Sequence, residues 1–334
     1  MDMEVANTSI RPSWMRYFWR RNYRTVIAFA ILVLLFVGYL IVYPGRLSDN
    51  FLSAWANQGA GLAFVAVGQT LVVLTSGIDM SIGSIFALTN CLASVFLNGN
   101  VYHILLALII IFGAGISCGL LNGILVSYMR IPPIILTIAT GAAYYGIALF
   151  IRPVTGGLVS EPLSDALTYS VFHIPTSLVL IFGTLILFWA LLRRTKLYTG
   201  IYAIGSSEKS AFMSGVKVRQ ARVAAYVFSG LFASIGGFFL SLQTLTGDAT
   251  IGMSYTLNSV AATVIGGTAL AGGIGSIFGS VVGSYLLRTL KGLMFFAGIA
   301  PMAQPLFEGI ILMCALSIGS TRLLGMKSKL DVFR

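Results

Sequence analysis

Charged residues are scarce in this sequence. Only 9 % of the 334 residues are Asp, Glu, Lys or Arg, whereas a soluble domain carries about 25 %. Apolar residues make up 57 % of the chain, so a water-facing surface cannot be covered from the few charges that remain. This composition excludes an ordinary soluble fold and indicates a chain that lies largely in lipid.

Residue types that perform catalysis or bind metals are also rare. The two histidines, His103 and His173, are 70 residues apart and have no neighbouring cysteines or carboxylates at metal-ligand spacing. The three cysteines lie singly in apolar stretches, which predicts free thiols that fill space. No phosphate loop of the form GxxxxGK[ST] occurs. We therefore expect no enzyme, no metal site and no cofactor bound by this chain.

The sequence contains several long uncharged stretches. A helix needs about 20 apolar residues to cross a membrane, and runs such as 29–36 are apolar on every face, which favours helices over barrel strands. The stretches are 25–45, 51–78, 80–129, 131–151, 166–192, 223–247 and 249–287, with a last span near 304–321. Turn residues at 98–100 and glycines between 266 and 273 divide the two that are too long. We predict an all-α integral membrane protein with about ten transmembrane helices.

The basic residues lie mostly on one side of this predicted topology. Seventeen of the 21 Lys and Arg fall in segments that ten helices with an internal N-terminus place in the cytoplasm. This asymmetry explains the net charge of +11 without a nucleic-acid partner. It predicts a cytoplasmic basic N-terminus at 1–24, one transmembrane domain at 25–322 with a cytoplasmic loop at 193–222, and a cytoplasmic C-terminus at 323–334.

Five polar residues inside the apolar stretches are candidates for a transport path. Asp79 is the only Asp, Glu, Lys or Arg between positions 50 and 129, and an ionisable residue inside a membrane is a functional candidate. It could equally cap a helix that begins at Met80 or Ser81. The other four are uncharged, and they could bind a hydroxylated solute or join helices to one another. They are Gln69, Thr70, Asn90 and Asn122.

A weak internal repeat relates the two halves of the chain. Residues 76–83 align with residues 272–279 at three of eight positions. Each segment joins two predicted spans, as paired helix breaks do in internally repeated transporters.

Three motifs of this chain resemble those of the ribose/galactose/xylose permease family, the membrane subunits of bacterial monosaccharide ABC importers. Residues 68–84 contain SGIDMSIGS, which is similar to the GGIDLSVGS of that family. Residues 202–216, followed by 226–230, resemble its cytoplasmic coupling loop, and 264–276 resemble a third, glycine-rich motif. Lys209 and Asn258 depart from the pattern, since the family usually has acidic residues there.

The resemblance implies a non-catalytic permease subunit in the bacterial inner membrane that imports a monosaccharide or a similar hydroxylated solute. The implied partners are a second permease chain, identical or related, two ABC ATPase domains that use ATP, a periplasmic sugar-binding protein and membrane lipid. A related ABC permease for nucleosides or branched-chain amino acids is the nearer alternative. A secondary transporter is a more distant one, for which Asp79 alone is thin support.

The loop 193–222 is predicted to carry the contact with the ATPase. Ser206 is a candidate N-cap, Glu208 would lie in the first turn, and Gly215 could adopt a left-handed stop, which predicts a helix of about eight residues. We expect Ala211, Phe212 and Met213 to enter a groove of the ATPase. The alternative is that Phe212 and Met213 pack on the ends of the chain's own helices. The full candidate set is Glu208, Lys209, Ser210, Ala211, Phe212, Met213 and Gly215.

Overall fold

The computed structural model describes residues 14–43, 45, 49–310 and 313. Its α-helices are α1 (Trp14–Val42), α2 (Asp49–Leu74), α3 (Ile82–Phe96), α4 (Val101–Tyr128), α5 (Pro133–Ile151), α6 (Glu161–Thr168), α7 (Thr176–Arg193), α8 (Lys196–Ser206), α9 (Glu208–Met213), α10 (Val218–Thr244), α11 (Gly252–Ile265) and α12 (Ile277–Phe296). Strands β1 (Ser170–Val171) and β2 (Ile174–Pro175) form an antiparallel hairpin, and a short 3-10 helix, η1 (Pro301–Ala303), follows α12.

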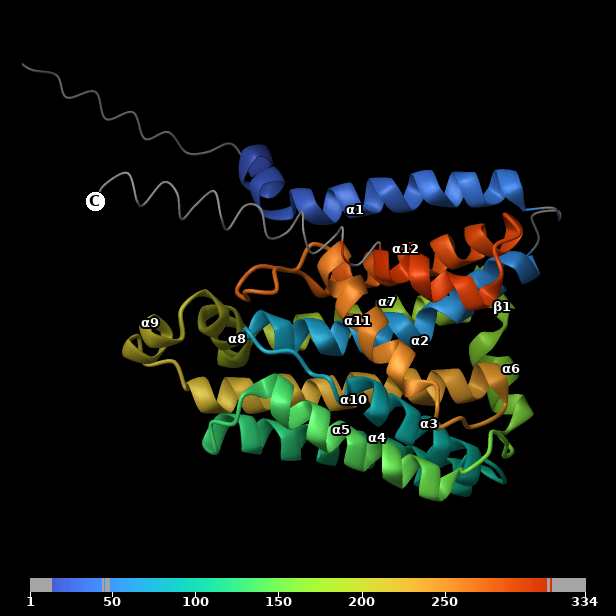
Figure 1. The fold of residues 1–334 in the computed structure, drawn as a ribbon, viewed down its shortest axis with the longest axis horizontal. Helices are drawn as coiled ribbons and strands as arrows, with labels where there is room; N and C mark the ends of the chain where they lie inside the picture. Colours follow the sequence, from blue (N-terminus) through green and yellow to red (C-terminus); the bar gives the residue numbers. More distant parts are fainter. Residues whose placement is uncertain (1–13, 44, 46–48, 311–312, 314–334) are drawn as a thin grey trace, which may run out of the picture.

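The long helices run side by side (Figure 1). Helices α2 and α10 pack against each other in the middle, α12 and then α1 lie on one side, and α4 and α5 lie on the other. Helices α8 and α9 lie at one end of this bundle, whereas α6 and the hairpin lie at the opposite end. The two ends of the bundle therefore carry different elements, and the long helices run between them.

Among the residues that the structure describes, six helices are long and apolar enough to cross a membrane. They are Tyr23–Val42, Asn50–Leu74, Val101–Tyr128, Pro133–Ile151, Thr176–Arg193 and Val218–Thr244. The outer ones leave large apolar side chains uncovered, such as Ile109 and Phe150, the latter 90 % exposed. Lipid tolerates such surfaces and water does not. A mostly helical, multi-pass membrane protein is thus confirmed, while the number of about ten spans stays a prediction. The span near 304–321 lies largely outside the described residues.

Helices α4 and α10 approach so closely that their backbones touch. A Cβ on Gly230 would overlap the carbonyl oxygen of Gly115, and one on Gly119 would overlap that of Tyr226. Small residues allow such contact between membrane helices, where dispersion and packing drive association. We call the contact through Gly115, Gly119 and Gly230 the α4–α10 seam.

Both predicted helix breaks are confirmed, and one predicted span began in the wrong place. Helix α3 ends before Asn100, whose side chain caps α4 by accepting from the His103 amide at 3.1 Å. The expected span 166–192 starts only at Thr176, because the preceding residues complete α6 and turn through the hairpin. Phe172 and His173 at that turn have left-handed φ values of 51° and 64°, which a continuous helix cannot contain.

The two segments of the weak repeat lie against each other. They connect α2 to α3 and α11 to α12. The Ser76 hydroxyl donates to the Ala271 carbonyl at 2.7 Å, and the Gly273 amide donates to the Leu74 carbonyl at 3.1 Å. The two breaks thus supply hydrogen-bond partners for some of each other's backbone groups. Backbone groups inside a membrane require such partners.

Candidate functional site

Asp79 lies fully buried in the break between α2 and α3. Its Oδ1 atom accepts from the amide of Ser81 at 3.0 Å and from the hydroxyl of the same residue at 2.6 Å. Its Oδ2 atom accepts from the Ser229 hydroxyl on α10 at 2.9 Å. Helix α3 begins at Ile82, slightly later than the start at Met80 or Ser81 that the sequence suggested.

Gln69 and Asn122 reach the same break from α2 and α4. With its amide oriented to satisfy both groups, Gln69 donates to the Asp79 carbonyl at 3.1 Å and accepts from the Asp79 amide at 3.3 Å. Asn122 donates to the Ser81 hydroxyl at 2.8 Å and accepts from the Tyr144 hydroxyl at 3.2 Å. We call these residues the Asp79 network: Gln69, Asp79, Ser81, Asn122, Tyr144 and Ser229.

The geometry of the Asp79 network fits the capping interpretation of Asp79. Every described bond of its carboxylate comes from an amide or a hydroxyl of the protein, and the result fastens an irregular backbone segment to neighbouring helices. Direct contact between Asp79 and a solute stays a prediction. Ser81 and Ser229 were absent from the candidate residues. The signal that could have found them is that both lie in motifs that resemble those of the permease family.

Thr70 belongs to a separate buried cluster. Its hydroxyl donates to the Ala66 carbonyl at 2.6 Å and makes a short contact with the hydroxyl of Ser280 on α12. The hydroxyl of Thr263 on α11 donates to the same Ala66 carbonyl at 3.2 Å. Thr70 therefore joins α2 to α11 and α12 and does not bond to the Asp79 network.

Asn90, a residue of α3, lies in a third place, where α3 contacts the end of α10 and the segment after it. Its amide nitrogen donates to the carbonyls of Gly237 and Thr246 at 3.4 and 3.3 Å, and its oxygen accepts from the Asp248 amide at 2.8 Å. The structure thus brings together Gln69, Asp79 and Asn122 but not Asn90 or Thr70. Each of the five is buried and bonded to protein.

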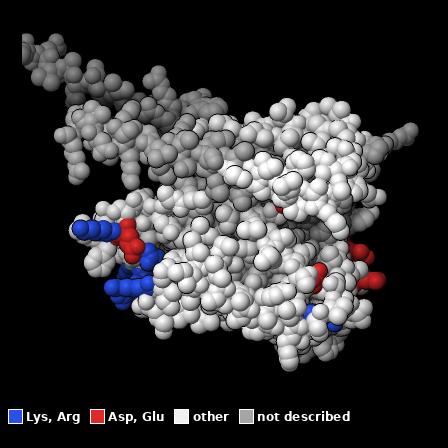
Figure 2. Space-filling view, viewed as in Figure 1, with Lys and Arg blue, Asp and Glu red and all other residues white. Residues whose placement is uncertain are grey.

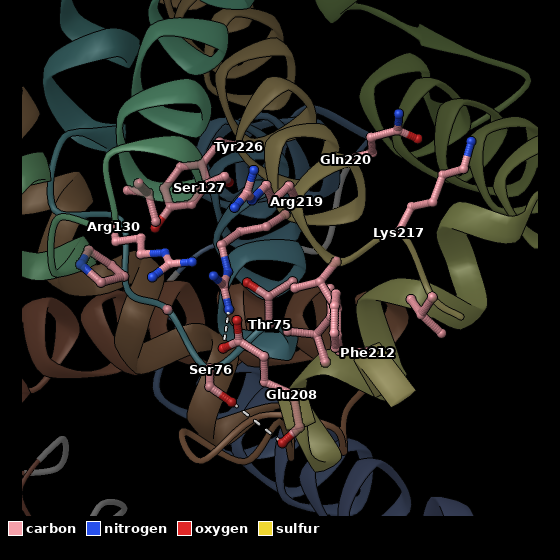
Figure 3. A pocket seen from close by; sticks show the side chains of 18 of the residues that line it. Thr75, Ser76, Ser127, Arg130, Glu208, Phe212, Lys217, Arg219, Gln220 and Tyr226 are labelled. Carbon is pink, nitrogen blue, oxygen red and sulfur yellow. Dashed lines mark hydrogen bonds and ion pairs between the residues drawn. The ribbon is translucent and has the colours of Figure 1, made fainter. Parts of the chain in front are cut away.

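A large cavity opens at the end of the bundle that carries α8 and α9. Its volume is about 1450 Å³, and residues of the C-terminal ends of α2 and α4, the start of α5, and α8 to α10 line it. Figure 3 shows the hydroxyl-bearing Thr75, Ser127 and Tyr226 on its wall together with the cations Arg130 and Arg219. Lys and Arg also gather at this end in Figure 2, whereas the flank of the bundle facing the viewer is mostly uncharged.

Helix α9 forms in the predicted loop, with two corrections. Its N-cap is Ser207, whose hydroxyl oxygen accepts from the Ser210 amide at 3.3 Å, whereas Ser206 is the last residue of α8. The helix has six residues, not about eight, because a separate helix occupies the chain up to Ser206. Gly215 has a φ of +79°, so the predicted left-handed position after the helix is confirmed.

The side chains of α9 divide into two groups. Ala211 is buried against Ile204 and Val218, which makes the expectation that it enters a partner wrong. Phe212 and Met213 are 73 % and 72 % exposed, so neither packs on the described ends of the chain's own helices. The remaining polar residues, Glu208, Lys209 and Ser210, are exposed. Glu208 forms an ion pair with Arg222 of α10 at 2.6 Å, which ties α9 to the next helix.

The described residues contain no group of three or more His, Cys, Asp or Glu side chains that could hold a metal ion. Cys91 and Cys118 are free thiols, while Cys314 lies outside the described residues.

Comparison with known proteins defines the class of this chain. A family model described as "Branched-chain amino acid transport system / permease component" matches residues 51–316. The ribose import permease of Bacillus subtilis (strain 168) is 31 % identical over 85 % of this chain and 89 % of its own length. The galactofuranose transporter permease of Escherichia coli (strain K12) is 31 % identical over 86 % and 84 %, and the D-allose permease of the same strain is 28 % identical over 84 % and 86 %. No solved structure matches this chain.

The chain therefore belongs to this family of ABC importer permeases. It is a non-catalytic membrane subunit, since ATP hydrolysis in such importers belongs to a separate subunit. Permease subunits of this kind bind no cofactor themselves.

Proposed function

We propose that this chain carries a monosaccharide, or a similar hydroxylated solute, from the periplasm to the cytoplasm across a bacterial inner membrane. The observation that carries the proposal is the set of relatives named for ribose, galactofuranose and allose, each of which matches more than four fifths of this chain. The description of the family model names branched-chain amino acids, so an amino acid is the alternative that the test includes.

The polar interior supports a neutral solute. Gln69, Thr70, Asn90 and Asn122 donate and accept hydrogen bonds without requiring a counter-charge. Together with Asp79 they are proposed to shape the path: Gln69, Asp79 and Asn122 by holding a helix break, and Thr70 and Asn90 by joining the helices around it.

The proposed assembly contains two permease chains, identical or related, two ATPase subunits and a periplasmic binding protein. In this chain, 25–322 forms the membrane domain, and 1–24, the loop 193–222 and 323–334 face the cytoplasm. The exposed Phe212 and Met213 of α9 support docking of the ATPase at this loop.

Uptake by cells that express the complete importer tests the solute class. We expect ATP-dependent uptake of at least one of D-ribose, D-allose or D-galactose, and loss of that uptake when this chain alone is deleted. Uptake of L-leucine in place of every sugar would establish the alternative. Transport that continues without the ATPase would instead indicate a secondary transporter.

A further inference from the structure

Two buried hydroxyl groups on the wall of the large cavity have no hydrogen-bond partner among the described residues. They belong to Ser127, at the end of α4, and Tyr226, in α10. The residues are 3 % and 0 % exposed, yet both line the cavity. Buried polar atoms are paired in the great majority of cases, so an unpaired one calls for an explanation such as a ligand.

Tyr226 is held firmly next to the helix break. Its ring packs with Val72 and Leu136, the former in the last turn of α2 and the latter in the first turn of α5. Its hydroxyl lies close to the backbone of the break, because a Cβ on Gly77 would come within 3.1 Å of it. Tyr226 also lies one helical turn before Ser229, which bonds to Asp79. The unpaired hydroxyl is therefore placed between the cavity and the Asp79 network.

Two of the cations that line this cavity are engaged elsewhere. The guanidinium of Arg219 lies over the Tyr128 ring, 5.4 Å from its centroid, and Arg222 pairs with Glu208. The buried groups that remain on this wall are neutral hydroxyls, each able to donate and to accept. Such a pair matches the hydroxyl groups of an uncharged solute better than it matches an ion.

We propose that Ser127 and Tyr226 form a binding subsite for the hydroxyl groups of the imported solute at this wall of the cavity. The subsite rests on the proposed function and extends it, since it names a place where the solute is held beside the helix break. It adds two residues that sequence analysis did not select as candidates.

The test measures uptake of radiolabelled D-ribose, D-allose and D-galactose by the complete importer in proteoliposomes, using the sugar that the unaltered complex imports best. Uptake is measured as the initial rate at a sugar concentration below saturation. We expect Ser127→Ala and Tyr226→Phe each to lower this rate about fivefold, since each removes one hydrogen bond to the solute. The double variant should lower it by more. Ser177→Ala is the matched control. It removes a buried, unpaired hydroxyl on α7 that does not line this cavity, so uptake should not change.

A second measurement separates binding from folding. Because the two hydroxyls have no protein partner among the described residues, their removal should leave the unfolding temperature of the purified permease unchanged or raise it. Normal sugar uptake by the double variant would overturn the subsite and leave the proposed function intact. A loss of uptake accompanied by a lower unfolding temperature would also overturn it. Failure of the unaltered complex to import any of the sugars would overturn the proposed function together with the subsite.

Discussion

At Asp79 the protein keeps a carboxylate out of water with no cation bonded to it among the described residues. Its oxygens instead accept hydrogen bonds from the amide and the hydroxyl of Ser81 and from the hydroxyl of Ser229. Hydrogen bonds to a charged group are stronger than those between neutral groups, about 1.5–3 against 0.5–1.5 kcal/mol. The carboxylate therefore fastens the helix break more strongly than an amide in the same place would.

Asp79→Asn tests this role. Asn also caps helices well, so we expect the permease to insert and pair normally. Uptake should fall roughly tenfold, because weaker bonds to Ser81 and Ser229 loosen the break by about 1 kcal/mol or more. Asp165→Asn, at an exposed position of α6, is the control and should import normally. Unchanged uptake and assembly in Asp79→Asn would leave the charge without a functional role.

The sequence indicated single polar residues around the break but not their partners. Asp79, Gln69 and Asn122 stand out because they interrupt apolar stretches. Ser229 is 150 positions away from Asp79 and resembles many other serines, and its bond to Asp79 depends on the packing of α10 against the break. Tyr226 was hidden for a similar reason, since an aromatic residue in an apolar helix predicts packing and its unpaired hydroxyl depends on what surrounds it.

Among the elements, α9 was predicted correctly in kind but not in its exact limits. A charged first turn and a following glycine indicated a short helix, and both features are present. The cap was misplaced by one residue because Ser206 and Ser207 are equally suitable by type. The start of α7 was missed because residues 166–175 are nearly uncharged and resemble a part of the span. In the structure these residues lie outside α7, and the Asn57 amide donates to the backbone carbonyl of Thr168 among them.

Phe212→Asp tests whether α9 contacts the ATPase. A large apolar side chain that is 73 % exposed at a loop tip is a candidate anchor for a partner, and loss of such an anchor typically costs 2 kcal/mol or more. We expect the ATPase no longer to co-purify and uptake to fall tenfold or more. Phe172→Asp introduces the same charge at a 91 % exposed position on the hairpin, at the opposite end, and should leave ATPase binding intact. Retained binding and normal uptake in Phe212→Asp would contradict docking through this helix.

For the whole molecule, composition alone predicted the class, because no soluble protein could be built from so few charges. The number of spans was harder to predict. α3 is apolar but only 15 residues long, so its length does not decide whether it crosses the membrane. The relative position of the breaks could not be read from the sequence either, since it depends on contacts between α2 and the segment before α12.

The orientation of the bundle can be tested with a reporter that is active only outside the cytoplasm. We expect a fusion after Met326, which lies outside the described residues, to be silent, and a fusion after Thr155 in the loop that follows α5 to be active. The reason is the excess of basic residues at the termini and around α8 and α9. Activity after Met326 would reverse the proposed orientation.

The α4–α10 seam has a mechanical consequence. Helices whose backbones touch at Gly115 and Gly230 cannot slide past each other without collision of the larger residues on either side. The two helices are therefore expected to move together. The ion pair of Glu208 with Arg222 attaches α9 to the N-terminal part of α10. A displacement of α9 would therefore act on α10, whose Ser229 donates to the carboxylate of Asp79. A continuous series of contacts thus connects the short exposed helix α9 with the buried helix break at Asp79.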